Sequence, residues 1–137
     1  MNFLIDTSAL VRILRREVDP AWVDFARRRR FAICEPVLCE ALASVGKNQA
    51  KMAEMNLLAG NQFVAVPDGA WDYVRAIRHD LMDRSMHNMF SVADYLIAAT
   101  AMQLKLTVLH EDKDFIAAAK IFPQLTQQRI TQTLPED

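Results

Sequence analysis

Short apolar runs alternate along the chain with longer stretches in which apolar residues recur at helical spacing. The first run, Phe3-Leu4-Ile5, is closed by Asp6-Thr7-Ser8, a combination typical of a buried strand followed by helix-capping residues. Prolines at helix starts and glycines after helix ends mark further boundaries. The pattern predicts strands over residues 3–5, 31–34, 63–66, 106–109 and 129–131. It predicts helices over 9–16, 20–30, 36–45, 50–59, 70–82 and 91–105, a loop over 84–90, and a short helix from about Asp114.

Short apolar strands that alternate with longer helices are typical of α/β domains built on a parallel sheet. We therefore predict an α/β/α sandwich with a mostly parallel, five-stranded sheet. No repeat, Gly/Ser-rich linker or low-complexity tract divides the sequence, so residues 1–137 are expected to form a single domain. Ligands of such folds bind beyond the carboxyl ends of the strands, and that edge is where functional residues are expected.

Composition excludes several classes of protein. The chain has 16 Lys and Arg residues against 17 Asp and Glu, so its overall charge does not favour nucleic acid. Hydrophobic residues make up 52%, which is enough for a core and excludes disorder. The cysteines, Cys34 and Cys39, fit neither a disulfide scaffold nor a zinc pattern. The start lacks signal-peptide features and the longest apolar stretch is too short to span a bilayer, so a cytoplasmic protein without a membrane segment is expected.

Two acidic residues follow the first two predicted strands. Asp6 comes directly after the first strand, at the carboxyl edge of the sheet, where capping of the next helix alone would explain it. Glu40 lies one turn into the helix that follows the second strand, near the same edge. Because Glu40 falls beside the apolar stripe of that helix, a solvated side chain is its simplest interpretation.

Two further aspartates are placed at this edge by the later elements. Asp94 is the only charge before Lys105 on a helix whose apolar residues cover almost every face. Ser91 and Asp94 fit a capping box, but an unpaired carboxylate beside a buried helix is costly and calls for a partner or a cation. The next strand begins directly after this helix, so the helix must start near the carboxyl edge. Asp112 follows that strand in a polar loop, where capping of the next helix is again the alternative.

Four carboxylates from separate segments are therefore predicted to share one edge. Two carboxylates about 4 Å apart repel by about 4 kcal/mol at an effective dielectric constant near 20, so a tight group requires a cation or raised pKa values. All-oxygen ligands select hard divalent ions such as Mg²⁺ or Mn²⁺. A metal ion held by acidic residues at an open site suits phosphodiester hydrolysis.

Four parts of the sequence together resemble a known family: MNFLIDTSAL at the start, Glu40, SVADYLIAAT around Asp94, and LTVLHEDKDF near the end. The family is that of the PIN-domain ribonucleases, and more narrowly the VapC-type toxins of bacterial toxin–antitoxin pairs. The likeness covers nearly the whole chain. It implies an α/β/α fold and an endoribonuclease that hydrolyses RNA with Mg²⁺ or Mn²⁺.

The resemblance assigns roles to the four carboxylates. Asp6, Asp94 and Asp112 would hold the metal ion, and Glu40 would bind it or orient the attacking water. An auxiliary acidic position and a hydroxyl that orients the first aspartate or binds phosphate map to Asp114 and to Thr7 or Ser8.

The family also implies partners: a homodimer, a cognate antitoxin that blocks the site, and a structured RNA substrate, often tRNA or rRNA. Many relatives carry a Gly and a His-Arg pair before the Asp94 helix, whereas this chain has Asp-Arg-Ser-Met-His at residues 83–87. No substrate role is therefore assigned to Arg84 or His87.

Two features leave alternatives open. The run Arg27–Arg30 suits the end of a helix, where cations offset the helix dipole, but it equally suits contact with RNA phosphates or with an antitoxin. Asp68, after the third predicted strand, and Lys113, after a later one, agree with a non-catalytic phosphoacceptor (receiver-like) domain. That alternative lacks the paired acids such a domain needs after its first strand, and it leaves Asp94 unexplained.

Overall fold

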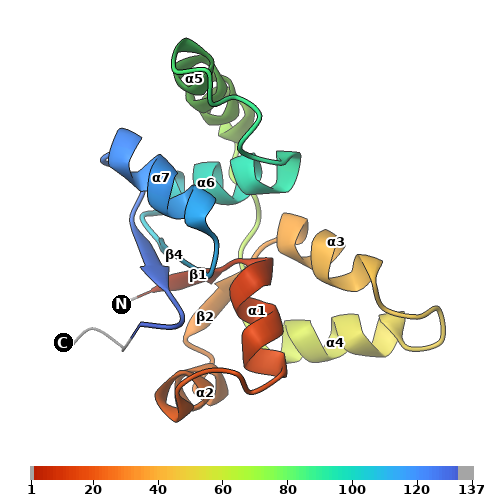
Figure 1. Ribbon diagram of the computed structural model, residues 1–137. Coiled ribbons are helices and arrows are strands. Elements are labelled where there is room, and N and C mark those ends of the chain that lie inside the picture. Colours follow the sequence, from red (N-terminus) through yellow and green to blue (C-terminus); the bar gives the residue numbers. More distant parts are fainter. Residues whose placement is uncertain (1, 133–137) are drawn as a thin grey trace.

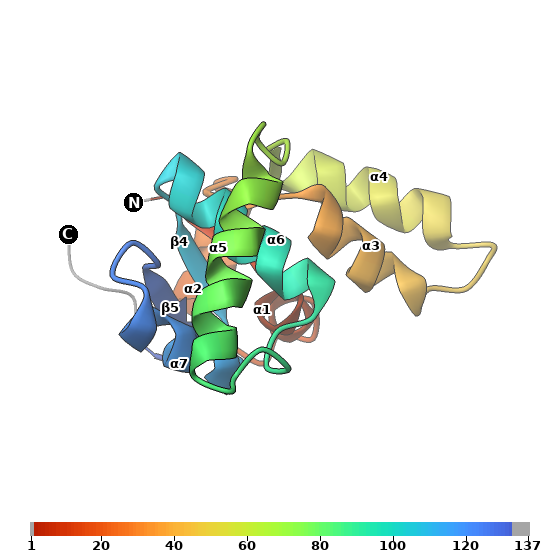
Figure 2. The same ribbon diagram turned by 90° about the horizontal axis from the view of Figure 1, so that it is seen from above.

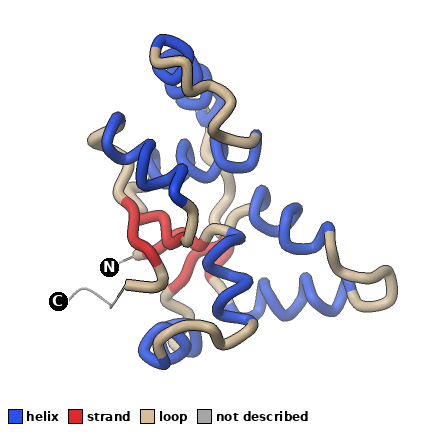
Figure 3. Tube along the Cα trace, viewed as in Figure 1, coloured by secondary structure: helices blue, strands red, loops and turns tan. Residues whose placement is uncertain are grey.

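A five-stranded, all-parallel sheet lies at the centre of the structure, a computed structural model that describes residues 2–132. The strand order is β3-β2-β1-β4-β5, so the first strand is central. Figure 3 shows the short strands enclosed by helices. The strands are β1 (Phe3–Ile5), β2 (Phe31–Ile33), β3 (Gln62–Phe63), β4 (Thr107–His110) and β5 (Gln127–Arg129).

Seven helices connect the strands within the described part of the chain. Figure 1 shows α1 and α2 on one side of the sheet and α5, α6 and α7 on the other, which confirms the predicted α/β/α arrangement. Figure 2 shows α3 and α4 side by side, extending away from the sheet. The helices are α1 (Thr7–Leu14), α2 (Pro20–Arg27), α3 (Glu35–Ala43), α4 (Ala50–Gly60), α5 (Ala70–Asp83), α6 (Val92–Leu104) and α7 (Lys113–Ile121).

An aromatic cluster fills the space between α2 and the sheet. The Trp22 ring meets Phe3 edge to face, with ring centroids 5.4 Å apart, and also packs against Phe25 and Phe31. The indole Nε1–H donates to the Gln132 carbonyl oxygen at 3.1 Å, so the polar end of a fully buried side chain is satisfied. This cluster fixes α2 beneath β1 and β2.

Several predicted boundaries are wrong by a few residues. The third strand is Gln62–Phe63 rather than 63–66, because only one further ladder bond, from the Val64 N–H to the Ile33 carbonyl, follows it. The fifth strand is Gln127–Arg129 rather than 129–131, because a polar edge strand carries little apolar pattern. The second helix ends at Arg27 rather than at residue 30, because the chain enters the left-handed region at Arg29, where φ is 54°.

Smaller shifts affect the other helices and strands. The first helix begins at Thr7 because Asp6 caps it, and α6 ends at Leu104 because Lys105 has a positive φ of 57°. The helix after the second strand runs from Glu35 to Ala43, not from 36 to 45.

The strand order does not match the receiver-like alternative. In receiver-type sheets the third strand lies beside the first, in the order 2-1-3-4-5. Here β3 is an edge strand and β1 lies between β2 and β4, so Asp68 follows a strand remote from Asp6. Within residues 2–132, no helix is both long and apolar enough to cross a bilayer.

Replacing Trp22 by Ala should lower the free energy of unfolding by about 3–5 kcal/mol, because it leaves a cavity among three aromatic rings. Trp71 offers a matched control, since 62% of it is exposed on α5 and its replacement by Ala should change stability by less than about 0.5 kcal/mol. Urea unfolding followed by far-UV circular dichroism measures both. Equal losses for the two variants would contradict the assigned packing.

Candidate acidic site at the carboxyl edge of the sheet

Asp6 occupies the end of the central strand and the N-cap of α1. Its backbone N–H donates to the Leu109 carbonyl at 2.9 Å, which ties it to β4, and only 3% of the residue is exposed. Its Oδ2 accepts hydrogen bonds from the Ser8 N–H at 3.2 Å and the Ser8 hydroxyl at 2.6 Å. Burial raises the pKa of Asp6, hydrogen bonds from Ser8 and Thr7 oppose this, and the charge of Glu40 adds to the rise.

Glu40 reaches the same edge from α3. The Thr7 hydroxyl donates to Glu40 Oε1 at 2.9 Å, which joins the start of α1 to α3. The two neighbouring hydroxyls thus donate hydrogen bonds to different carboxylates, Ser8 to Asp6 and Thr7 to Glu40. Glu40 is exposed, so its side chain lies at the open side of the site.

Asp94 belongs to a capping box at the start of α6. The Ser91 N–H donates to Asp94 Oδ2 at 3.0 Å, and the Asp94 N–H donates to the Ser91 hydroxyl at 3.1 Å. Burial raises the pKa of Asp94, the hydrogen bonds from Ser91 oppose this, and the charges of Asp6 and Asp112 raise it further. The three aspartates therefore share one electrostatic environment.

Asp112 is the N-cap of α7, where its Oδ1 accepts the Asp114 N–H at 2.9 Å. Asp114 follows in the first turn of α7. Burial raises the pKa of Asp114, and the charge of Asp112 adds to this, while Lys113 opposes it. Asp114 thus lies within the electrostatic range of the group.

Each of the three aspartates has one oxygen held by a helix start. The other oxygen, Oδ1 of Asp6 and Asp94 and Oδ2 of Asp112, accepts no hydrogen bond of standard geometry from residues 2–132. In the same residues, no three His, Cys, Asp or Glu side chains are grouped closely enough to hold one metal ion together. The charges of Asp6 and Asp112 act on Asp94, but the three carboxylates do not lie close enough together to ligate one ion. Their hard oxygen donors fit a divalent ion such as Mg²⁺ in chemical type.

The loop that carries Asp112 is held by residues that the sequence pattern did not single out. Arg129 Nη2 donates to Glu111 Oε2 at 2.6 Å, and the Thr131 hydroxyl donates to Glu111 Oε1 at 2.8 Å. Burial raises the pKa of Glu111, but the hydrogen bonds from Arg129 and Thr131 outweigh burial and leave the pKa below its ordinary value. The Glu111 N–H donates to the Ser8 hydroxyl at 2.9 Å, so Ser8 bridges this loop and Asp6.

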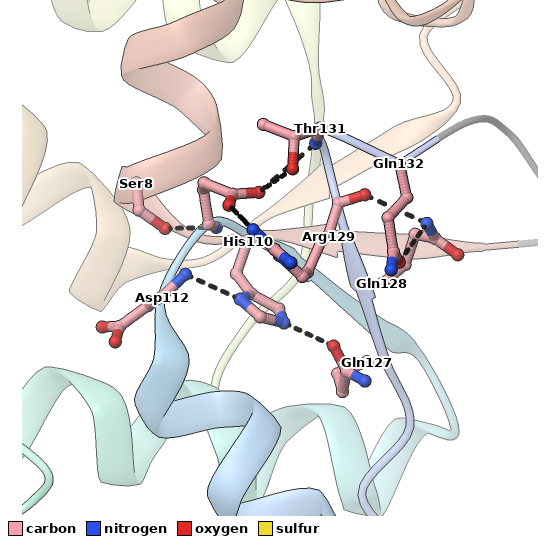
Figure 4. Close-up of polar contacts among 9 residues, drawn as sticks. Ser8, His110, Asp112, Gln127, Gln128, Arg129, Thr131 and Gln132 are labelled. Carbon is pink, nitrogen blue, oxygen red and sulfur yellow. Dashed lines mark hydrogen bonds and ion pairs between the residues drawn. The ribbon is translucent and has the colours of Figure 1, made fainter.

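Sequence reasoning also missed His110, which it used only as part of a motif. It is fully buried at the end of β4 and bonded to Gln127 and to the backbone of Asp112, as Figure 4 shows. Burial lowers the pKa of His110, although the Gln127 hydrogen bond and the charges of Asp6, Glu111 and Asp112 oppose this. The sequence feature that could have identified His110 is its place on a strand whose other residues are apolar apart from Thr107.

Comparison with known proteins identifies relatives over most of the chain. The sequence model of the PIN domain family matches residues 3–121. The curated protein "Ribonuclease VapC6" of Mycobacterium tuberculosis is 30% identical over 107 residues, covering 77% of this chain and 84% of the relative. "Ribonuclease VapC2" of the same species is 34% identical over 144 residues, covering 98% of this chain and 96% of the relative.

The fold also matches solved structures. The structure of VapBC-1 from nontypeable Haemophilus influenzae matches with a TM-score of 0.77 at 12% identity, covering 96% of this chain and 100% of that chain. At this level of identity the match establishes the fold alone.

Replacing Asp94 by Asn should raise the Tm of the metal-free protein at pH 7. Because the folded-state pKa of Asp94 lies above 3.8, its contribution to stability is complete below pH 3.8 and is lost as the pH rises through the folded-state pKa. The neutral amide avoids that loss. Thermal melts in EDTA should therefore show a difference between variant and wild type that shrinks as the pH falls towards 3.8.

Asp80, exposed on α5, provides the matched control through Asp80→Asn. A Tm for Asp94→Asn that is unchanged or lower than wild type at neutral pH would show that its ionised carboxylate carries no such penalty.

Proposed function

Because the chain belongs to the PIN domain family, we propose that it is a divalent-metal-dependent endoribonuclease that hydrolyses phosphodiester bonds of RNA. The observation that supports the proposal is that β1, α6 and the β4–α7 loop bring three aspartates to one edge, where Asp6 and Asp112 lie near enough to Asp94 for their charges to act on it. Each has one oxygen fixed and the other available. Mg²⁺ or Mn²⁺ is the proposed ion, because the donors are all oxygen.

The residues at this site have separate proposed roles. Asp6, Asp94 and Asp112 would hold the ion through the oxygens that their helix caps leave unoccupied, which requires the three side chains to move closer together than they lie in the structure. When bound, a divalent ion stabilises negative charge on the phosphate and lowers the pKa of water. Glu40, at the open side, would bind the ion or orient the attacking water, while the Thr7 hydroxyl holds one oxygen of its carboxylate, Oε1. Ser8 keeps Asp6 oriented through its 2.6 Å hydrogen bond.

We further propose that the protein is the toxin of a toxin–antitoxin pair, that it acts as a homodimer, and that tRNA or rRNA in the cytoplasm is its target. Structures with this fold include a member of the VapBC family of toxin–antitoxin systems from Mycobacterium tuberculosis. An apolar groove of about 510 Å³ between α1, α2, α3 and α4 supports a protein partner. Arg16 and Arg27 also line it, so its charge suits an apolar segment with acidic flanks.

The four-arginine run has mostly structural contacts. Arg28 pairs with Asp24 at 3.1 Å, Arg29 donates to the Asn61 carbonyl at 3.2 Å, and Arg30 lies over the Phe25 ring. Of these four residues Arg27 is the one that lines the groove, together with Arg16 from outside the run, so Arg27 is the member of the run proposed to contact the antitoxin.

Asp94→Asn should reduce RNA cleavage at saturating Mg²⁺ by at least about 100-fold, since even changes behind a metal ligand commonly cost 10–100-fold. The same variant is expected to be more stable than wild type without metal, so loss of activity could not be attributed to unfolding. Single-turnover cleavage of a tRNA or rRNA pool, with Asp80→Asn as control, measures the effect. A folded Asp94→Asn protein that cleaves as fast as wild type would refute the catalytic assignment.

Mn²⁺ should raise the Tm of wild type, because an ion that binds only the folded state adds about 2.7 kcal/mol at 100 times its dissociation constant. Asp94→Asn should lose most of this gain, whereas Asp80→Asn should keep it. A wild-type protein without any gain at millimolar Mn²⁺ would favour a non-catalytic regulator with the same fold.

A further inference from the structure

A chain of hydrogen bonds connects β5 with the backbone of Asp112. His110 Nδ1 accepts the Asp112 N–H at 2.9 Å, and His110 Nε2 lies 2.7 Å from Gln127 Oε1. The ring is fully buried and packs on Phe115, with centroids 5.3 Å apart. Figure 4 shows the ring between Asp112 and Gln127.

The geometry fixes which ring nitrogen carries the proton. A backbone N–H only donates, so Nδ1 must be the unprotonated acceptor. The proton of the neutral ring is therefore on Nε2, which donates to Oε1 of the Gln127 side-chain amide. The two bonds support each other, because both favour the same tautomer and loss of the Gln127 acceptor leaves a buried N–H without a partner.

The contacts beyond His110 limit how the Asp112 carboxylate can move. Its backbone nitrogen is held by His110, and its Oδ1 is held by the Asp114 N–H. The preceding residue, Glu111, is bonded to Ser8 through its N–H, and Ser8 in turn holds Asp6. The same hydrogen-bonded unit therefore reaches two of the three aspartates.

We infer that His110 and Gln127 are positioning residues that set the place of Asp112 Oδ2 for the divalent ion. This inference rests on the proposed function, because it takes Asp112 as a ligand of that ion. Neither residue would contact RNA or the ion. They act through the backbone of Asp112, as partners behind metal ligands commonly do.

The direct test is Gln127→Met, which keeps side-chain length and removes the acceptor. We expect Mn²⁺ affinity of the RNA-free, full-length protein to fall about 10- to 100-fold, measured by electron paramagnetic resonance of free Mn²⁺. At saturating metal, kcat should fall while KM for RNA stays the same. Gln128→Met is the matched control, because Gln128 has the same chemistry on the same strand, and its side chain hydrogen-bonds within residues 2–132 to Arg129 and Gln132 rather than to His110.

A second pair of variants separates positioning from packing. An Asn side chain accepts a hydrogen bond from the N–H two residues later, so His110→Asn retains an acceptor for Asp112 without the ring. His110→Leu fills the space but has no acceptor. Mn²⁺ affinity should be lost in His110→Leu and largely recovered in His110→Asn, even though both variants lose the contact between the His110 and Phe115 rings.

The outcomes distinguish this inference from the function on which it rests. Wild type that neither binds Mn²⁺ nor cleaves RNA would overturn both. Wild type that binds Mn²⁺, with Gln127→Met folded and unchanged in affinity, would overturn the positioning role alone. Equal Mn²⁺ affinity in His110→Leu and His110→Asn would also overturn it, because packing rather than the acceptor would then be what matters.

Discussion

Crowded negative charge at the carboxyl edge of the sheet is the constraint on which the other features of this protein depend. Asp6 is buried, and burial raises the pKa of Asp94, which the charges of Asp6 and Asp112 raise further. Burial and like charge act in the same direction, since both favour the neutral acid. A site of this kind costs stability by itself, so the surrounding structure must offset the cost if the carboxylates are to stay ionised.

Helix starts provide part of that compensation. Asp6 and Asp112 are the N-caps of α1 and α7, and Asp94 lies in the first turn of α6. The start of a helix carries a partial positive charge and free N–H groups, which favour a carboxylate there. Capping and metal binding are therefore compatible uses of one side chain, because the cap occupies a single oxygen of each aspartate. The capping interpretations of Asp6, Asp94 and Asp112 are confirmed, and they leave room for the ligand role, which stays a prediction.

The sequence predicted the fold well wherever apolar pattern and topology determine it. Buried β1, β2 and β4 follow from their apolar runs, and parallel strands must bring Asp6, Glu40, Asp94 and Asp112 towards one edge. Their role as ligands stays a prediction. The fifth strand was predicted too far along the chain, because the residues of β5, Gln-Gln-Arg, are polar and leave no apolar pattern. Some contacts depend on side-chain directions, which a sequence pattern does not contain. These are the hydrogen bonds of Thr7 to Glu40, of Ser8 to Asp6 and between His110 and Gln127.

The groove and part of the acidic site share the helices α1 and α3. Leu10 and Ile13 of α1 line the groove, and so does Ile5, which directly precedes Asp6. On α3, Ala41 and Leu42 line it immediately after Glu40. A partner seated there would press on the elements that carry Asp6 and Glu40, whereas Asp94 and Asp112 belong to α6 and the β4–α7 loop. Thr7 hydrogen-bonds to Glu40, and Ser8 joins Asp6 to Glu111, which directly precedes Asp112. A displacement of α1 would therefore act on Asp6, on Glu40 and on the loop that carries Asp112.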